Sequence, residues 1–416
     1  MTFATLAPTH MPASRLAERY QSVVTVLVSV FIFCGAISLI EPSPYDLAAV
    51  IALPLWMMGG FRVNKFIVYL AVAWTIRELA AFVALIPYWN EPDPRLFQFQ
   101  SLYLYVTVIF FTIYFAERTH ERANAALRAY AASTVLSAFV AIMSYLNLFG
   151  LEALTTIEGR VAGTFKDPNV FGSYLTLGAV IFLHSLLVGR ARWPILSAIS
   201  LGMVLTGVFL SFSRGSWGAT IFALLLTAGT AFATHRDPRM RRRIILTAFA
   251  GFIILVLVLL IVLSQDSIRE FFFQRAKLEQ EYDGGVTGRF GNQLRSLPML
   301  LDRPFGFGPL RFRLTFDLEP HNSYIGAFAN GGWLGGFSWI VIVLATVYAG
   351  FRLMFRPSPY RDYAQMVFPA LLALLLQGFQ IDIDHWRQLF LMCGLLWGLE
   401  AARRRWISAG CPPGGG

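Results

Sequence analysis

Charged residues are scarce in this chain, and cysteines are few. Only 14% of the 416 residues are Asp, Glu, Lys or Arg, whereas 56% are hydrophobic and 37 are Phe. Charged residues make up about a quarter of a typical soluble domain, so this composition excludes an ordinary water-soluble protein. Cys34 and Cys393 lie in apolar runs and Cys411 lies near the end, which excludes a disulfide framework and a spaced metal cluster. The chain is predicted to be a polytopic membrane protein.

Apolar runs long enough to cross a bilayer recur along the whole length. A membrane-spanning helix needs roughly 17 to 25 residues. The predicted spans lie at 20–40, 44–61, 66–86, 98–116, 129–149, 169–188, 194–212, 216–234, 244–264, 322–353, 364–381 and 386–402. The expected fold is therefore all-α, an integral membrane protein of about 12 transmembrane helices, with one long polar loop at 265–320.

The basic residues predict the orientation, because short loops rich in Lys and Arg stay on the cytoplasmic side. With the N-terminus inside, the inside segments include clusters such as Arg241 to Arg243 and Arg403 to Arg405. Both termini are thus predicted to be cytoplasmic and the 265–320 loop to lie outside. The net charge of +10 reflects this topology and does not indicate a nucleic-acid partner. Short outside connections hold only Arg95, Arg160, Lys166, Arg214 and Arg387.

Two polar islands interrupt the apolar runs on the predicted outer face. In the first, Asp167-Pro168-Asn169 predicts a turn and a capped helix start, with Arg160 or Lys166 as an alternative charge partner for a ligand. In the second, Arg214 ends an apolar run among small residues. An Arg at a membrane boundary is costly unless it pairs or lines a cavity. Topological anchors usually lie inside, so an outward-facing Arg214 favours a ligand contact.

The third island is the long loop and its exit. A lipid-soluble chain has little reason to carry such a basic outer segment unless that segment binds an anion, so we predict a phosphate or diphosphate site. An amphipathic segment is expected from Gln293 to Leu301, followed by a glycine-rich turn. The basic residues of the loop are Arg269, Arg275, Lys277, Arg289, Arg295, Arg303, Arg311 and Arg313.

His321 stands at the mouth of the tenth predicted span. An imidazole titrates near neutral pH, so His321 is the candidate to deprotonate a hydroxyl, and a helix cap or an orienting group is the alternative. Asp382 and Asp384, with His385, form the other acidic cluster on this face. They can ligate a metal, act as a base, or form a polar turn that closes two helices.

Taken together, these islands resemble the bacterial O-antigen ligase and polysaccharide polymerase superfamily. The resemblance covers roughly residues 159–340, and the N-terminal five spans carry no matching motif. The matching pieces are Gly163-Thr164-Phe165-Lys166-Asp167-Pro168-Asn169, Ser211-Phe212-Ser213-Arg214-Gly215, Gly288-Arg289, Asp302-Arg303-Pro304-Phe305-Gly306-Phe307-Gly308, His321-Asn322-Ser323-Tyr324 and Gly331-Gly332-Trp333-Leu334-Gly335.

The resemblance implies a glycosyltransferase that needs no metal and no cofactor and works on the periplasmic face of the bacterial inner membrane. Such proteins pass a glycan from undecaprenyl diphosphate to a hydroxyl, either on lipid A core in ligases or on the next lipid-linked repeat unit in polymerases. By position, Arg214 and Arg289 correspond to diphosphate-contacting arginines and His321 to the outer-face histidine. The implied substrate-binding residues are Arg160, Lys166, Arg303 and Asn322.

The expected organisation has N-terminal helices at 1–150, a ligase- or polymerase-like core with the periplasmic loop at 151–355, and C-terminal helices with a cytoplasmic tail at 356–416. The expected partners are a lipid-linked oligosaccharide, a glycan or lipid A core acceptor, membrane lipid, and polysaccharide export or chain-length proteins. Ligase and polymerase are not separated by these motifs. The alternative function is a transporter or flippase of lipid-linked oligosaccharides, although the paired repeats common in transporters are absent from the sequence.

Overall fold

The computed structural model describes residues 15–151, 156–157, 159–264, 266–276, 285 and 288–410. These residues form fifteen α-helices, one short 3-10 helix and one two-stranded antiparallel sheet. In the sheet, β1 (Thr156–Ile157) pairs with β2 (Arg160–Val161), and Thr156 lies opposite Val161. The prediction of an all-α fold is therefore confirmed.

Each predicted span overlaps one helix. These helices are α1 (Arg15–Cys34), α2 (Pro44–Met58), α3 (Lys65–Leu85), α4 (Pro92–Ala116), α5 (Thr119–Tyr145), α7 (Pro168–Leu187), α8 (Pro194–Leu210), α9 (Arg214–Thr234), α10 (Pro238–Val262), α14 (Ser323–Phe355), α15 (Arg361–Gln377) and α16 (Arg387–Ser408). By length and composition, seven helices of the described chain can cross a membrane: α1, α3 with the adjoining η1 (Ile86–Tyr88), α4, α5, α7, α9 and α14. This supports a membrane protein, and the number of twelve spans stays a prediction.

The predicted outer segment holds three more helices in its described part, α11 (Asp266–Ala276), α12 (Arg289–Leu301) and α13 (Arg313–Phe316). The predicted amphipathic segment thus forms most of α12. Lys277, residues 1–14 and the tail from 411 to 416 lie outside the described residues. The side of the membrane on which this segment and the two termini lie stays a prediction.

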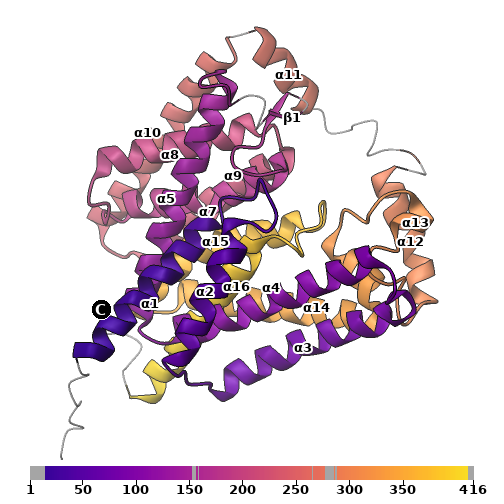
Figure 1. Cartoon of the computed structure of the whole chain (residues 1–416). Coiled ribbons are helices and arrows are strands. Elements are labelled where there is room, and N and C mark those ends of the chain that lie inside the picture. The colour runs from indigo at the N-terminus through magenta and orange to yellow at the C-terminus, as the bar shows by residue number, and fades with distance from the viewer. Residues whose placement is uncertain are drawn as a thin grey trace, which may run out of the picture.

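The helices form two groups that α15 and α16 join (Figure 1). In one group α3 packs between α4 and α14, and α12 and α13 lie at one end of these three helices. In the other group α7 packs against α5, α8 and α9, and α10 packs beside α9. α15 contacts α7 and α9 of the second group, and α16 contacts α4 of the first.

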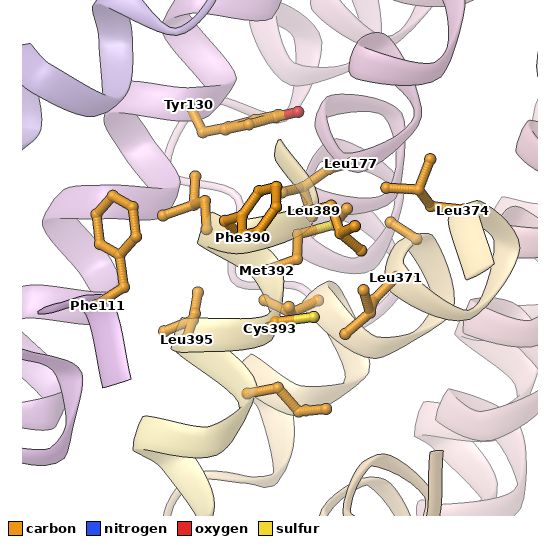
Figure 2. Packing of buried hydrophobic residues seen from close by; sticks show 14 of the residues in the cluster. Phe111, Tyr130, Leu177, Leu371, Leu374, Leu389, Phe390, Met392, Cys393 and Leu395 are labelled. Atoms are coloured by element: carbon orange, nitrogen blue, oxygen red, sulfur yellow. The ribbon is translucent and has the colours of Figure 1, made fainter. Parts of the chain in front are cut away.

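The hydrophobic core is centred on α16. Figure 2 shows Phe390, Met392 and Cys393 of α16 packed among side chains of α4, α5, α7 and α15. Gly394 and Gly398 allow α4 to approach closely. A Cβ on Gly394 would lie 2.4 Å from Phe111 Cβ, and one on Gly398 would lie 2.6 Å from Phe115 Cβ. Small residues four positions apart are a common device for close packing of membrane helices.

A glycine-rich turn is inserted into a break in α14. Gly332 has φ +60° and ψ −159°, a conformation essentially restricted to glycine. In an unbroken helix the N–H of Trp333 would donate to the carbonyl of Ala329. Here Trp333 N donates to Pro304 O at 2.9 Å, and Ala329 O accepts from Phe307 N at 2.7 Å and from Gly308 N at 3.0 Å. The turn therefore satisfies both groups that the break exposes, and it holds the end of α12 against α14.

Candidate functional site

One cavity of about 320 Å³ brings together arginines from four separate segments. Arg160 belongs to β2, Arg275 lies near the end of α11, and Arg214 and Arg289 are the first residues of α9 and α12. The other lining residues are Phe212, Gly215, Phe290, Gln377, Gln380 and Ile381. Among the described residues that line it, none is acidic. Guanidinium groups bind phosphate oxygens in a fixed, often bidentate geometry, so this lining suits an anion with several oxygens.

Arg214 owes its place to the start of α9. Ser213 caps the helix, and its Oγ accepts from Ser216 N at 3.3 Å. Phe212 has φ +45°, which turns the chain sharply between α8 and α9. Directly after Arg214, a Cβ on Gly215 would lie 3.0 Å from Gln377 Nε2. A larger residue at 215 would therefore displace the Gln377 side chain that lines the cavity. The small neighbours of Arg214 therefore keep space for a ligand.

Arg160 is fixed by the neighbouring helix ends. Its Nη2 donates to Asn169 Oδ1 at 2.8 Å, and its Nε donates to Ser211 O at 3.1 Å. Asn169 lies in the first turn of α7, where the Asp167 side chain caps the helix by accepting from Asn169 N and Val170 N. The prediction of a capped helix start at Asp167-Pro168-Asn169 is thus confirmed, and the same helix start orients Arg160 in the cavity wall.

Arg275 reaches the cavity because α11 packs on aromatic side chains. The Phe272 ring stacks on the rings of Phe209 and Trp217, at 5.8 and 5.3 Å between centroids. The Phe271 ring meets the edge of Phe212 at 4.6 Å. Sequence reasoning counted Arg275 among the basic residues of the loop but did not single it out as a site residue.

Arg289 lines the cavity from the start of α12. Its guanidinium carbon is 4.9 Å from the centroid of the Phe290 ring, and Phe290 lines the same cavity. Gln377 was also missed from the sequence. It is buried at the end of α15, and its Oε1 accepts from Ser173 Oγ at 2.8 Å, which holds the amide beside Gly215. Two of the three predicted catalytic residues, Arg214 and Arg289, therefore share one cavity with Arg160.

His321 does not line this cavity, but it is held by the segment that does. Its backbone N–H donates to Asp382 Oδ2 at 3.0 Å, and its Nδ1 lies 3.8 Å from the same oxygen. Asn322 N donates to Asp382 Oδ1 at 3.0 Å. Asp382 directly follows Ile381 of the cavity wall. With φ +47°, His321 adopts a left-handed backbone that the two hydrogen bonds to Asp382 stabilise.

The two carboxylates of the 378–386 connection have separate partners. Burial raises the pKa of Asp382 to about 7, and the nearby charges of Asp384 and Glu319 add to the rise against the backbone hydrogen bonds. Burial also acts to raise the pKa of Asp384, but the charges of His385 and Arg77 outweigh it, so this pKa is lowered. Asp384 Oδ1 lies 3.6 Å from His385 Nδ1. In the described residues no group of three or more His, Cys, Asp or Glu side chains is arranged to hold a metal ion.

The connection thus forms the polar turn that was one of the alternatives for Asp382 and Asp384. Asp382 ties it to the start of α14. His385 ties it to α4, since its ring lies 4.1 Å from the Phe97 ring and its Nε2 is 3.3 Å from Phe97 O. Sequence reasoning left the role of this cluster open, because the partners of Asp382 lie about sixty residues away in the chain.

The remaining predicted substrate-binding residues lie outside the cavity wall. Lys166 is exposed and pairs with Glu41 at 2.9 Å. Arg303 is exposed, and its guanidinium carbon is 4.6 Å from the centroid of the Phe307 ring. Asn322 is buried and caps α14, accepting from Tyr324 N and Ile325 N and donating to Phe379 O at 3.1 Å. Their contact with a substrate stays a prediction.

Residues 198–340 match the model of the O-antigen ligase family. The matched part is about a third of the chain and contains Arg214, Arg275, Arg289 and His321, while Arg160 and Asp382 lie outside it. No curated protein matches the chain. The match confirms the resemblance to the O-antigen ligase superfamily and indicates a membrane enzyme of surface polysaccharide assembly.

Proposed function

We propose that this membrane protein of the O-antigen ligase superfamily is a glycosyltransferase on the periplasmic face of the bacterial inner membrane. It transfers a glycan from undecaprenyl diphosphate to an acceptor hydroxyl, and it does so without a metal ion. Its two termini are cytoplasmic, and the segment between α10 and α14 is periplasmic.

The observation that carries this proposal is the cavity with four arginines. When the bond between the anomeric carbon and the diphosphate oxygen breaks, the leaving group keeps the electron pair and gains negative charge. Arg160, Arg214, Arg275 and Arg289 surround the space where such a group fits. Donors that are already in position where charge develops contribute about 10²- to 10³-fold in rate each. These guanidinium groups supply the positive charge for which many transferases use a divalent cation.

His321 is the proposed acceptor-activating residue. The acceptor oxygen attacks the anomeric carbon, its proton passes to the imidazole, and undecaprenyl diphosphate leaves. Asp382 holds the backbone of His321 and lies 3.8 Å from the ring nitrogen. A carboxyl group in that position orients the imidazole. Asp382 is therefore a positioning residue in this proposal, and it acts through His321.

The acceptor is a glycan. We favour the next lipid-linked repeat unit, as in a surface-polysaccharide polymerase, over the lipid A core that a ligase uses. The compact outer segment and its Arg-rich start support this preference. Lys166, Arg303 and Asn322 are proposed to contact the donor or acceptor glycan beyond the diphosphate. Export or chain-length proteins are proposed partners.

The experiment uses purified protein in EDTA with a synthetic lipid-diphosphate oligosaccharide, offered alone and with lipid A core. A ladder of longer lipid-linked glycans identifies a polymerase, and a single shifted core band identifies a ligase. Donor binding without transfer in either tube contradicts the enzyme and favours the transporter or flippase. Loss of transfer on adding EDTA, with recovery on adding Mg²⁺ or Mn²⁺, contradicts the metal-independent mechanism.

Two arginines of α11 give a matched control for the site. Arg275 lines the cavity, whereas Arg269 is exposed and pairs with Asp266 three residues before it. Replacing Arg214, Arg289 or His321 by Ala is expected to abolish transfer without affecting membrane insertion. Arg269→Ala is expected to leave transfer unchanged. Normal product from all three site variants would contradict the site assignment.

A further inference from the structure

The helix α12 exposes an apolar stripe along one face. Phe290, Leu294, Leu297 and Leu301 are 44%, 70%, 48% and 70% exposed. They follow one another at spacings of four, three and four residues, which places them on one side of an α-helix. α12 belongs to the polar segment between α10 and α14. If that whole segment lay in water, the apolar stripe would be exposed to water.

Three uncharged polar residues of α12 lie on the protein side instead. Asn292, Gln293 and Ser296 are buried. Asn292 Nδ2 donates to Phe316 O at 3.0 Å, and Gln293 Nε2 donates to Pro320 O at 2.9 Å. A helix on an aqueous surface turns its polar side outward. α12 shows the opposite arrangement, because its apolar side faces outward. That side suits an apolar environment.

The stripe continues onto the outer surface of α14, a helix that can span a membrane. Trp333 Nε1 donates to Leu300 O at 3.0 Å, so the end of α12 is fixed beside this part of α14. From there, Trp333, Leu334 and Phe337 are exposed on α14, at 43%, 59% and 58%. A partly exposed Trp with a satisfied indole N–H is typical of the membrane boundary. Exposed Arg295 and Arg303 flank the stripe, where they complement anionic headgroups.

We propose that α12 lies flat in the bilayer leaflet nearest the Ser323 end of α14, with its apolar stripe between the acyl chains. The lipid of this same bilayer is thus the partner of the stripe. α12 begins at Arg289 and Phe290, which line the arginine cavity. The contact of α12 with the bilayer therefore places the cavity at the level of the headgroups. The membrane contact does not depend on the proposed glycosyl transfer.

Spin labels on α12 test the proposal in the full-length protein. In a chain with Cys34, Cys393 and Cys411 replaced, a nitroxide is attached to Leu294→Cys, Leu297→Cys or Leu301→Cys. The matched control is Asp302→Cys, an exposed residue about a quarter turn away from the stripe. The protein is reconstituted in vesicles of phosphatidylethanolamine with a minority of phosphatidylglycerol. Collision with oxygen, which concentrates in lipid, is compared with collision with a water-soluble nickel complex.

The expected result is that oxygen collides more than nickel at the three stripe positions and that the order is reversed at residue 302. If the stripe labels collide with nickel as residue 302 does, the stripe lies in water and the proposal is wrong. If both reagents are excluded from the stripe, another protein or a second copy covers it, and the proposal is equally wrong.

A second measurement needs no substitution. A photoactivatable phospholipid with its reactive group in the acyl chain is cross-linked to the unaltered protein in the same vesicles, and the adducts are mapped. Adducts are expected on the peptides that contain Phe290, Leu294 and Leu297, as well as on the Phe337 region of α14. Adducts on α14 without any on α12 would overturn the proposal.

Discussion

Asp382→Asn separates the positioning of His321 from the chemistry of the arginines. The carboxylate accepts two backbone N–H groups, from His321 and Asn322, both at 3.0 Å. An Asn side chain keeps one acceptor oxygen and places an NH₂ group where the other oxygen was. One of the two backbone donors then faces another donor, and the left-handed backbone of His321 loses half of its support.

The expected magnitude follows from that lost hydrogen bond. Above about pH 7 Asp382 is ionised, and a hydrogen bond to a charged group contributes about 1.5 to 3 kcal/mol. Each 1.36 kcal/mol on a barrier is about tenfold in rate. If the loss acts on the orientation of His321 in the transition state, the turnover number should fall about 10- to 150-fold. Affinity for the lipid diphosphate should change little, because Asp382 does not line the arginine cavity.

The assay is initial transfer rate against donor concentration, with donor binding measured separately. The matched control is Asp317→Asn, because Asp317 is an exposed carboxylate of the 265–320 segment and its φ of +61° is one that Asn tolerates. The control should keep its full rate. A wild-type turnover number for Asp382→Asn would refute the positioning role, and a loss confined to donor affinity would move Asp382 into the diphosphate site.

Three further predictions concern the cavity, the pH dependence of stability and the break in α14. Arg275→Ala should lower the transfer rate about 10²-fold or more, as expected for a hydrogen-bond donor at developing charge. Arg269→Ala on the same helix should leave the rate unchanged. If the two variants transfer glycan at the same rate, Arg275 does not belong to the site. The raised pKa of Asp382 means that the folded protein binds a proton between about pH 4 and 7 that the unfolded chain has released, so this group lowers stability as pH rises through that window. The lowered pKa of Asp384 acts only below about pH 4. The unfolding temperature in detergent should therefore fall between about pH 4 and 7, and Asp382→Asn should flatten that fall. Gly332→Ala should destabilise the protein by more than about 1 kcal/mol, because the new Cβ collides with Pro304 O and φ is positive, whereas Gly229→Ala in α9 has open space and should be neutral or stabilising in the same thermal assay.

Sequence reasoning succeeded where a local pattern determines the structure. The apolar runs predicted the positions of the long apolar helices, and Asp167-Pro168-Asn169 predicted the capped start of α7. Arg214 was found from its place among small residues and by resemblance, Arg289 by resemblance, and the structure brings them into one cavity. In each case the signal lies within a few neighbouring residues.

The sequence did not distinguish Arg275 from Arg269, although both lie on α11. What separates them is the packing of Phe271 and Phe272 on aromatic rings of α8 and α9 and of the turn between them, which turns one arginine into the cavity and leaves the other exposed. Asp382 was recognised as a possible metal ligand, base or turn residue, but its partners, His321 and Asn322, lie about sixty residues away, just before α14. Tertiary packing decides both roles, and no local pattern records it.

The break in α14 connects the two parts of the proposed active site. The turn at 303–308 fixes the end of α12, and Arg289 is the first residue of that helix. The same turn fills the gap at Gly332, and His321 lies just before the start of α14. Gln293 of α12 also donates to the carbonyl of Pro320, directly before His321. The spacing between the leaving-group site and the acceptor-activating histidine therefore depends on how α12 sits against the first third of α14. It follows that a substitution at Gly306 or Gly332, which touches neither substrate, should reduce transfer in protein that remains folded.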